Sequence, residues 1–148
     1  MPKNKVTLLD RARADLGTAK MILERMDSDD VFIDVAAHHC QQCVEKAAKF
    51  LILMQGDVYA NDHRTDEYLP DLKHEAAKEL IEQISFTIDR WATTIRYSHT
   101  ILASKKSVEE VIPVCERLIK LAEKEIPPQV EINNKNGVGR IAESDGDI

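Results

Sequence analysis

Very few residues in this chain interrupt a helix, and this feature limits its fold more than any other. The 148 residues include only five glycines and five prolines. These two residue types break helices most strongly, so turns are few and helices can run long. The sequence therefore predicts an all-α protein wherever its apolar residues recur at helical spacing.

Apolar residues do recur every three or four positions in the first part of the chain. Residues 8–26 carry one such stripe, and Thr7 is a suitable N-cap for the helix. A second helix is predicted from about residue 30 to Gly56, a residue type that commonly ends helices. Its stripe is broad, so we expect this helix to be central. The two stripes are Leu9, Ala12, Leu16, Ala19, Ile22 or Leu23 and Met26, and then Ala36, Cys40, Val44, Ala47, Leu51 and Met54.

The middle of the chain contains one ambiguous segment. A polar connection with a short helical turn is expected before Pro70, and helical composition resumes at Asp71. Residues 84–88 alternate between apolar and polar, as strands do. Their isoleucines also fit helical spacing together with Trp91, and no second strand is evident. We therefore interpret this segment as helix.

A last helix is predicted in residues 107–126. Ser107 and Glu110 have the spacing of a capping box, Pro113 either kinks the helix or shifts its start, and Pro127 ends it.

The chain is thus expected to form one domain. Residues 1–126 are predicted to fold as an up-and-down antiparallel bundle of four to five helices, and residues 127–148, which lack periodicity, as a disordered tail.

Composition excludes some classes of protein. The net charge of −6 argues against nonspecific DNA binding, which needs clustered cations. No apolar run is long enough to span a membrane, and the first residues lack the apolar core of a signal peptide, so a cytoplasmic location is expected. The three cysteines form no disulfide framework, which suits a reducing compartment.

Metal and cofactor sites have little support in the sequence. His39 and Cys43 share a helix face and could bind one ion, but a zinc site needs three or four ligands, and no second cluster has ligand spacing. Glycine-rich phosphate loops are missing. We therefore expect no metal and no cofactor, and interpret the cysteines as buried thiols.

Polar side chains on the second helix form the first candidate site. His38, Gln42, Glu45 and Lys49 follow four-three-four spacing and line one side of the helix. One interpretation is a hydrogen-bond network between helices. The other is a polar seam at a dimer interface or a nucleotide cleft.

The second candidate site is the segment "IRYSHT" at residues 95–100. Arg96, Tyr97 and His99 stand at the end of a predicted helix and suit contacts with phosphate and base. The alternative is a surface arginine beside a packed tyrosine.

These segments together resemble a known family. "AAHHCQQCVEKAAKFLILMQG" is similar to the signature helix of the HEPN domain (higher eukaryotes and prokaryotes nucleotide-binding), with its glutamines, Glu-Lys pair and following glycine. "DHRTDEYL" resembles the His-centred segment of that family, "IRYSHT" its Arg-Tyr-Pro element, and "ARADLGTAKMIL" its leading helix. The resemblance covers residues 8–125.

The resemblance implies a fold and a range of functions. HEPN domains are helical bundles, commonly homodimers, and are often encoded beside a minimal nucleotidyltransferase as a two-component or toxin–antitoxin pair. Many are metal-independent ribonucleases that use an Arg-x(4–6)-His motif. The chain departs from that motif: two residues separate Arg96 from His99, eight separate Arg90 from His99, and nine separate Arg64 from His74. Ser98 also replaces the usual proline.

Two hypotheses follow from the resemblance. The first is a noncatalytic, homodimeric HEPN module that binds a nucleotide, RNA or a nucleotidyltransferase, with Arg96, Tyr97, His99, His38, Gln42, Glu45 and Lys49 as its ligand-binding residues. The alternative is a metal-independent endoribonuclease with a displaced catalytic site, in which Arg96 stabilises the phosphorane charge and His99 transfers protons.

Overall fold

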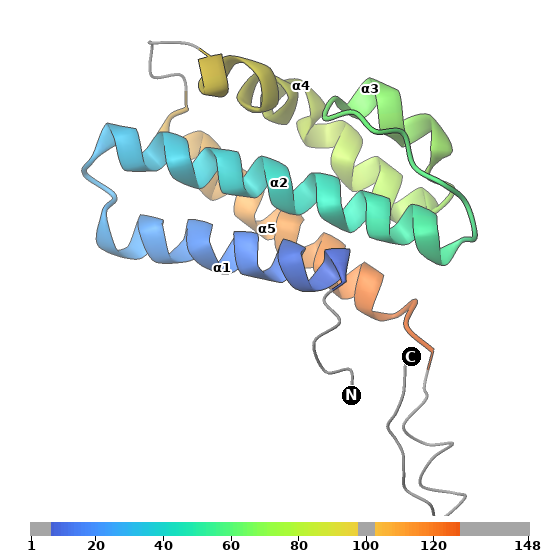
Figure 1. Ribbon diagram of the computed structural model, residues 1–148. Coiled ribbons are helices and arrows are strands. Elements are labelled where there is room, and N and C mark those ends of the chain that lie inside the picture. The colour runs from blue at the N-terminus through green and yellow to red at the C-terminus, as the bar shows by residue number, and fades with distance from the viewer. Residues whose placement is uncertain (1–6, 98–102, 128–148) are drawn as a thin grey trace, which may run out of the picture.

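The fold consists of helices joined by short connections. The computed structural model describes residues 7–97 and 103–127, with side chains for all of these except residues 93–97. Figure 1 shows α1 and α2 running side by side in opposite directions, with α5 and α4 packed behind them. In chain order the elements are α1 (Leu8–Arg25), α2 (Asp30–Met54), α3 (Thr65–Tyr68), the short 3₁₀ helix η2 (Leu69–Asp71), α4 (Glu75–Tyr97) and α5 (Lys105–Glu123).

The predicted fold class is confirmed. The described residues form an antiparallel all-α bundle without a strand, and residues 84–88 lie inside α4. The predicted tail falls almost wholly in residues 128–148, outside the described residues. No helix in the described part of the chain is both long and apolar enough to cross a membrane.

The start of α1 follows from its local sequence. Thr7 Oγ1 accepts a hydrogen bond from Asp10 N (3.1 Å), and Asp10 Oδ2 accepts one from Thr7 N (3.0 Å), which completes a capping box. The predicted stripe then faces the core. Its first four residues are buried, and its last, Met26, is exposed at the end of the helix.

Helix α2 is the central element of the bundle, as its broad stripe predicted. It contacts α1, α4 and α5, and it contributes more buried hydrophobic residues to the core than any other described helix. Asp29 caps its first turn by accepting from Val31 N and Phe32 N. Gly56 has φ of 92°, the left-handed conformation that glycine adopts without strain, and so confirms the predicted end of the helix.

Two helix starts differ from the predicted ones. Helix α4 begins at Glu75 rather than near Asp71, because Leu69–Asp71 form the 3₁₀ turn η2. Helix α5 is capped by Ser104, whose Oγ accepts from Ser107 N (3.1 Å), and not by Ser107 itself. Both serines have suitable chemistry, so the sequence did not distinguish them.

Helix α5 also tolerates its proline. Pro113 lies in the interior of α5 with its ring exposed, and α5 continues beyond it to Glu123. The cost is one missing backbone hydrogen bond on the solvent side. The other side of α5 buries Val108, Val111, Cys115 and Leu118 against the rest of the bundle.

Candidate functional site

Helix α2 carries two polar clusters in addition to its core residues. The Glu45 cluster comprises Gln41, Gln42, Glu45, Lys49 and His63, and faces the loop that follows α2. The Asp15 cluster comprises Asp15, His39 and Lys46, and joins α1 to α2.

At the centre of the Glu45 cluster is a buried ion pair. Lys49 Nζ donates to Glu45 Oε2 at 2.8 Å, and the two side chains are only 6% and 8% exposed. Gln41 Nε2 donates to the other carboxylate oxygen at 2.9 Å, and His63 Nδ1 lies 3.1 Å from both oxygens. Burial alone would raise the pKa of Glu45, but the hydrogen bonds from Lys49, Gln41 and His63 outweigh it, and the pKa is lowered.

Lys49 ties the same cluster to the loop. Its Nζ donates to the backbone oxygen of Asp62 (2.8 Å) and lies 5.1 Å and 5.8 Å from the ring centres of Tyr59 and Tyr68. Tyr68 is fully buried, and burial, together with the charges of Glu45 and Asp89, raises the pKa of its hydroxyl well above the usual value. The Glu45 cluster therefore fixes residues 59–68 against α2.

Among the described residues the glutamines form no hydrogen bond between helices, so the interpretation of an interhelical network is wrong for them. Gln42 Nε2 donates to Gln41 Oε1 (2.7 Å), and Gln41 donates to Glu45, so both bonds stay within α2. The link to the rest of the fold runs through Glu45 and Lys49 instead. This chain of contacts also orients the amide of Gln42 at the edge of the Glu45 cluster.

The interhelical role belongs to the Asp15 cluster, which sequence reasoning missed. Asp15 Oδ1 hydrogen-bonds His39 Nδ1 (2.8 Å), and Asp15 Oδ2 accepts from Lys46 Nζ (2.6 Å). Asp15 is 8% exposed although it carries a carboxylate. Its place between Ala12 and Leu16 on the apolar stripe of α1 was the available signal, because an acid there must find a partner when it is buried.

Of the other candidate residues, only His38 has a described side chain. His38 is partly buried, and its ring lies edge-on to that of His39 with centres 5.9 Å apart. Arg96 and Tyr97 are the last residues of α4, but their side chains are not described, and His99 lies outside the described residues. Figure 1 places the end of α4 at the same end of the bundle as the start of α2.

One hydrogen bond ties this end of the bundle together. Asp34 Oδ1, one turn before His38 on α2, accepts from the backbone nitrogen of Ala103, where the described chain resumes after α4. The segment that contains His99 is therefore bounded on one side by α4 and on the other by a contact with α2. Of the predicted α2 residues, His38 lies one helical turn from this contact, whereas Glu45 and Lys49 contact the loop at residues 62–63.

Metal ligands do not converge in the described residues, where no group of three or more His, Cys, Asp or Glu side chains has suitable geometry. Cys40, Cys43 and Cys115 are buried, as predicted. Hydrogen bonding with Cys40 and Cys43, and then burial, raises the pKa of Cys115 well above the usual value, which keeps the thiol protonated and unreactive.

A match to a family sequence model identifies the family of this chain. The sequence model of the HEPN domain matches residues 6–126, which include all the described helices. The chain belongs to the HEPN domain family. Searches of curated proteins and of solved structures find no match. Membership of the HEPN family supports a role related to nucleotides or RNA in general terms, and confirms the resemblance seen in the sequence.

Proposed function

We propose that this HEPN domain is a noncatalytic binding module that acts as a cytoplasmic homodimer. It binds a nucleotide and engages a nucleotidyltransferase partner in a two-component or toxin–antitoxin system. Its ligand site is formed by Arg96, Tyr97 and His99 together with the polar face of α2, from His38 to Lys49.

The observation that carries this proposal is the meeting of α4 and α2. The hydrogen bond from Ala103 N to Asp34 Oδ1 (2.9 Å) holds the chain after α4 one turn from His38. Arg96 and Tyr97 end α4 at the same end of the bundle. A cation, an aromatic ring and histidines within this region suit a ligand with a phosphate and a base.

Each residue type has a definite chemical part. An arginine guanidinium binds phosphate oxygens with two parallel N–H groups, and a tyrosine ring offers a surface on which a base stacks. Gln42 donates its amide N–H to Gln41, and no described donor reaches its carbonyl oxygen, so that oxygen can accept from a base amino group. Glu45 and Lys49 are buried and act through Gln41 to hold Gln42 in place.

The noncatalytic assignment rests on the sequence. Cleavage of RNA without a metal needs a group that transfers protons and a cation for the phosphorane charge. No Arg-His pair has the spacing of the family's ribonuclease motif, and Arg96 and His99 are separated by only two residues. Ribonuclease activity is therefore the alternative against which the proposal is tested.

The test combines binding and cleavage on the same preparation. The full chain is titrated by calorimetry with adenine and guanine mono-, di- and triphosphates, and is incubated with a fluorescent single-stranded RNA in EDTA. We expect saturable binding of at least one nucleotide and intact RNA. Absence of nucleotide binding would leave only the protein-partner role. RNA cleavage that disappears in both Arg96→Ala and His99→Ala would establish the ribonuclease alternative.

A further inference from the structure

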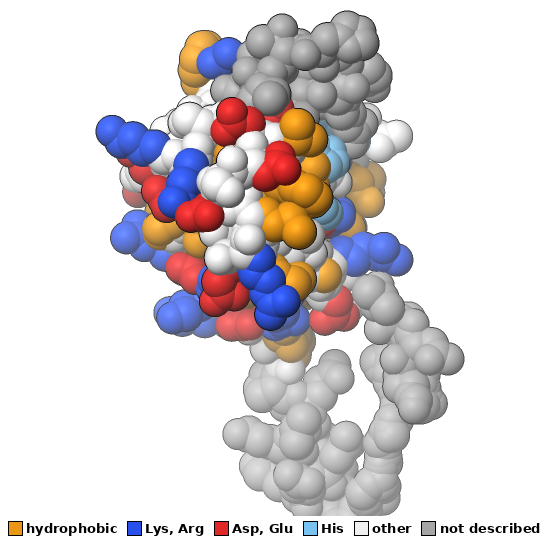
Figure 2. Space-filling view, turned by 90° about the vertical axis from the view of Figure 1, so that its left-hand side faces the viewer, with side chains coloured by type: hydrophobic (Ala, Val, Ile, Leu, Met, Phe, Trp, Pro, Cys, Tyr) orange, Lys and Arg blue, Asp and Glu red, His pale blue; other side chains and the backbone are white. Residues whose placement is uncertain are grey.

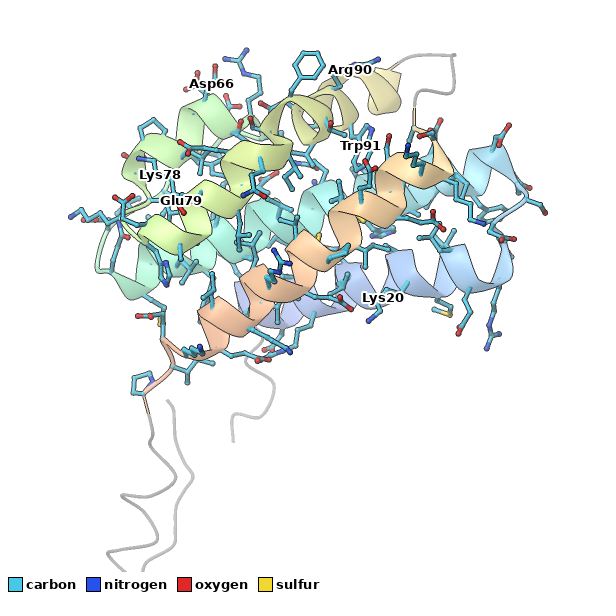
Figure 3. All side chains as sticks on the ribbon, turned by 180° about the vertical axis from the view of Figure 1, so that it is seen from behind. Lys20, Asp66, Lys78, Glu79, Arg90 and Trp91 are labelled. Atoms are coloured by element: carbon cyan, nitrogen blue, oxygen red, sulfur yellow. The ribbon has the colours of Figure 1, made fainter. Side chains whose placement is uncertain are left out.

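A shallow groove of about 390 Å³ runs between α4 and α5, on the side of the bundle seen in Figure 3. Its floor is apolar and is formed by Ala76, Leu80 and Leu121. Its α5 wall carries Arg117 and Lys120, and its α4 wall carries Glu79 and Gln83. Many small-molecule sites combine an apolar surface of this size with a few polar groups.

The two cations on the α5 wall are not held in ion pairs by the described residues. The acids of α5 that face α1 are neutralised there: Lys20 pairs with Glu116 at 2.7 Å, and Arg13 with Glu123 at 2.8 Å. Arg117, the neighbour of Glu116, has no ion-pair partner within 4 Å among the described residues, and neither has Lys120. An anion in the groove would therefore meet unpaired cations.

The register of the two helices orients such an anion. Helices α4 and α5 run antiparallel, and the contact between His74 Nε2 and Glu125 Oε2 (3.8 Å) marks their register. About one turn and a half further along each helix from this contact, Glu79 of α4 is level with Lys120 of α5, and Gln83 is close to Arg117. A carboxylate is repelled by Glu79 and favoured at the other end, beside the Arg117 guanidinium and the neutral Gln83 amide.

We propose that this groove binds a small amphiphilic carboxylate, of the kind of a medium-chain fatty acid. The carboxylate pairs with Arg117, whose planar N–H groups match its two oxygens. The apolar chain lies over Leu80 and Leu121 toward Ala76. This site is independent of the proposed nucleotide site, since Gln83 and Arg96 lie 13 positions apart on α4, or roughly 20 Å.

The experiment follows octanoate binding to the full ¹⁵N-labelled chain by amide chemical shifts. We expect saturable shifts at residues 76–83 and 117–121. Arg117→Gln is expected to weaken binding by about tenfold or more, because a charge-assisted contact is lost. The matched control is Lys106→Gln, which removes an exposed cation three turns away on the same face of α5 and should keep the wild-type affinity.

The contribution of the carboxylate is tested with octyl glucoside, which has an alkyl chain of similar length and no charge. It should bind at least about tenfold more weakly than octanoate. Equal affinity for the two ligands, equal affinity of wild type and Arg117→Gln, or octanoate shifts that lie outside the groove would each overturn the proposal. Arg117 is exposed, so its replacement should leave the melting temperature unchanged and the comparison valid.

Discussion

Glu45 and Lys49 form an ion pair one turn apart on α2, with 2.8 Å between Oε2 and Nζ and with both side chains more than nine-tenths buried. Such a pair specifies a geometry more than it adds stability, since desolvation offsets most of the attraction. Here the geometry includes Gln41, His63 and the loop carbonyl of Asp62. The pair therefore couples the candidate site on α2 to the chain that follows it.

Breaking the buried pair should destabilise the fold strongly. Glu45→Ala leaves the Lys49 ammonium buried without its carboxylate, and we expect a loss of about 3–5 kcal/mol in the free energy of unfolding. Urea unfolding followed by circular dichroism measures this loss. Arg13→Ala, which breaks an exposed pair with Glu123, serves as control and should cost less than about 1 kcal/mol. Equal effects of the two variants would contradict the burial of the pair.

The stability of the fold should depend on pH through Glu45. Its pKa is lowered in the folded state from the ordinary value of 4.5, so in acid the unfolded chain binds more protons than the folded one. The stabilisation is complete above about pH 5 and is lost as the pH falls through the folded-state pKa. Exposed acids such as Asp27, whose pKa is lowered by its hydrogen bond with Lys105, add to this pH dependence.

The contribution of Glu45 is isolated by comparing urea midpoints of wild type and Glu45→Gln between pH 7 and pH 3.5. The difference between the two proteins should be largest at pH 7 and should shrink in acid. A constant difference over this range would mean that Glu45 has the same pKa in the folded and unfolded chains, and would contradict this account of the pH dependence.

The Asp15 cluster should stabilise the packing of α1 on α2. Asp15→Ala removes the acceptor of both His39 and Lys46, and hydrogen bonds to charged groups contribute about 1.5–3 kcal/mol each. We expect a loss of about 2–4 kcal/mol after partial rehydration of the partners. Glu24→Gln on the same helix is exposed and should change stability by less than about 0.5 kcal/mol. An Asp15→Ala variant with the same free energy of unfolding as the wild type would show that the Asp15 cluster does not stabilise the packing of α1 on α2.

How much of this the sequence predicts depends on how local each signal is. Thr7 and Gly56 act on their own helix ends, so spacing and residue type sufficed to predict them. The stripes of α1 and α2 likewise predicted most of the buried hydrophobic residues of these two helices. The pairing of Asp15 with Lys46, and of Glu45 with His63, depends on which helix faces and loops meet, and a single sequence does not contain that register. The choice between Ser104 and Ser107 as the N-cap of α5 could not be made from the sequence either, because both residue types are suitable.

The proposed homodimer has a candidate interface at the end of the bundle where α1 stops and α2 begins. Figure 2 shows exposed hydrophobic side chains gathered there beside histidine side chains, and Met26, Val31, Phe32 and Val35 are all more than one third exposed. Contiguous exposed apolar surface often marks an interface. Light scattering at micromolar concentration should give twice the chain mass of 16.8 kDa.

The interface is tested by Val31→Glu, which places a charge in this surface and should yield a monomer. Val58→Glu, at an 84% exposed position in the loop after α2, is the matched control and should remain dimeric. A wild-type protein that is monomeric, or two variants that behave alike, would count against this surface.

The nucleotide proposal is tested most directly at Arg96. Arg96→Ala and the control Arg90→Ala remove the same charge from α4, and the Arg90 side chain lies exposed over the ring of Phe86 (6.0 Å). Calorimetric titration with the nucleotide that wild type binds should show affinity reduced by roughly 10- to 150-fold for Arg96→Ala and unchanged for Arg90→Ala, with equal melting temperatures. Wild-type affinity in Arg96→Ala, or an equal loss in both variants, would contradict a phosphate-binding role for Arg96.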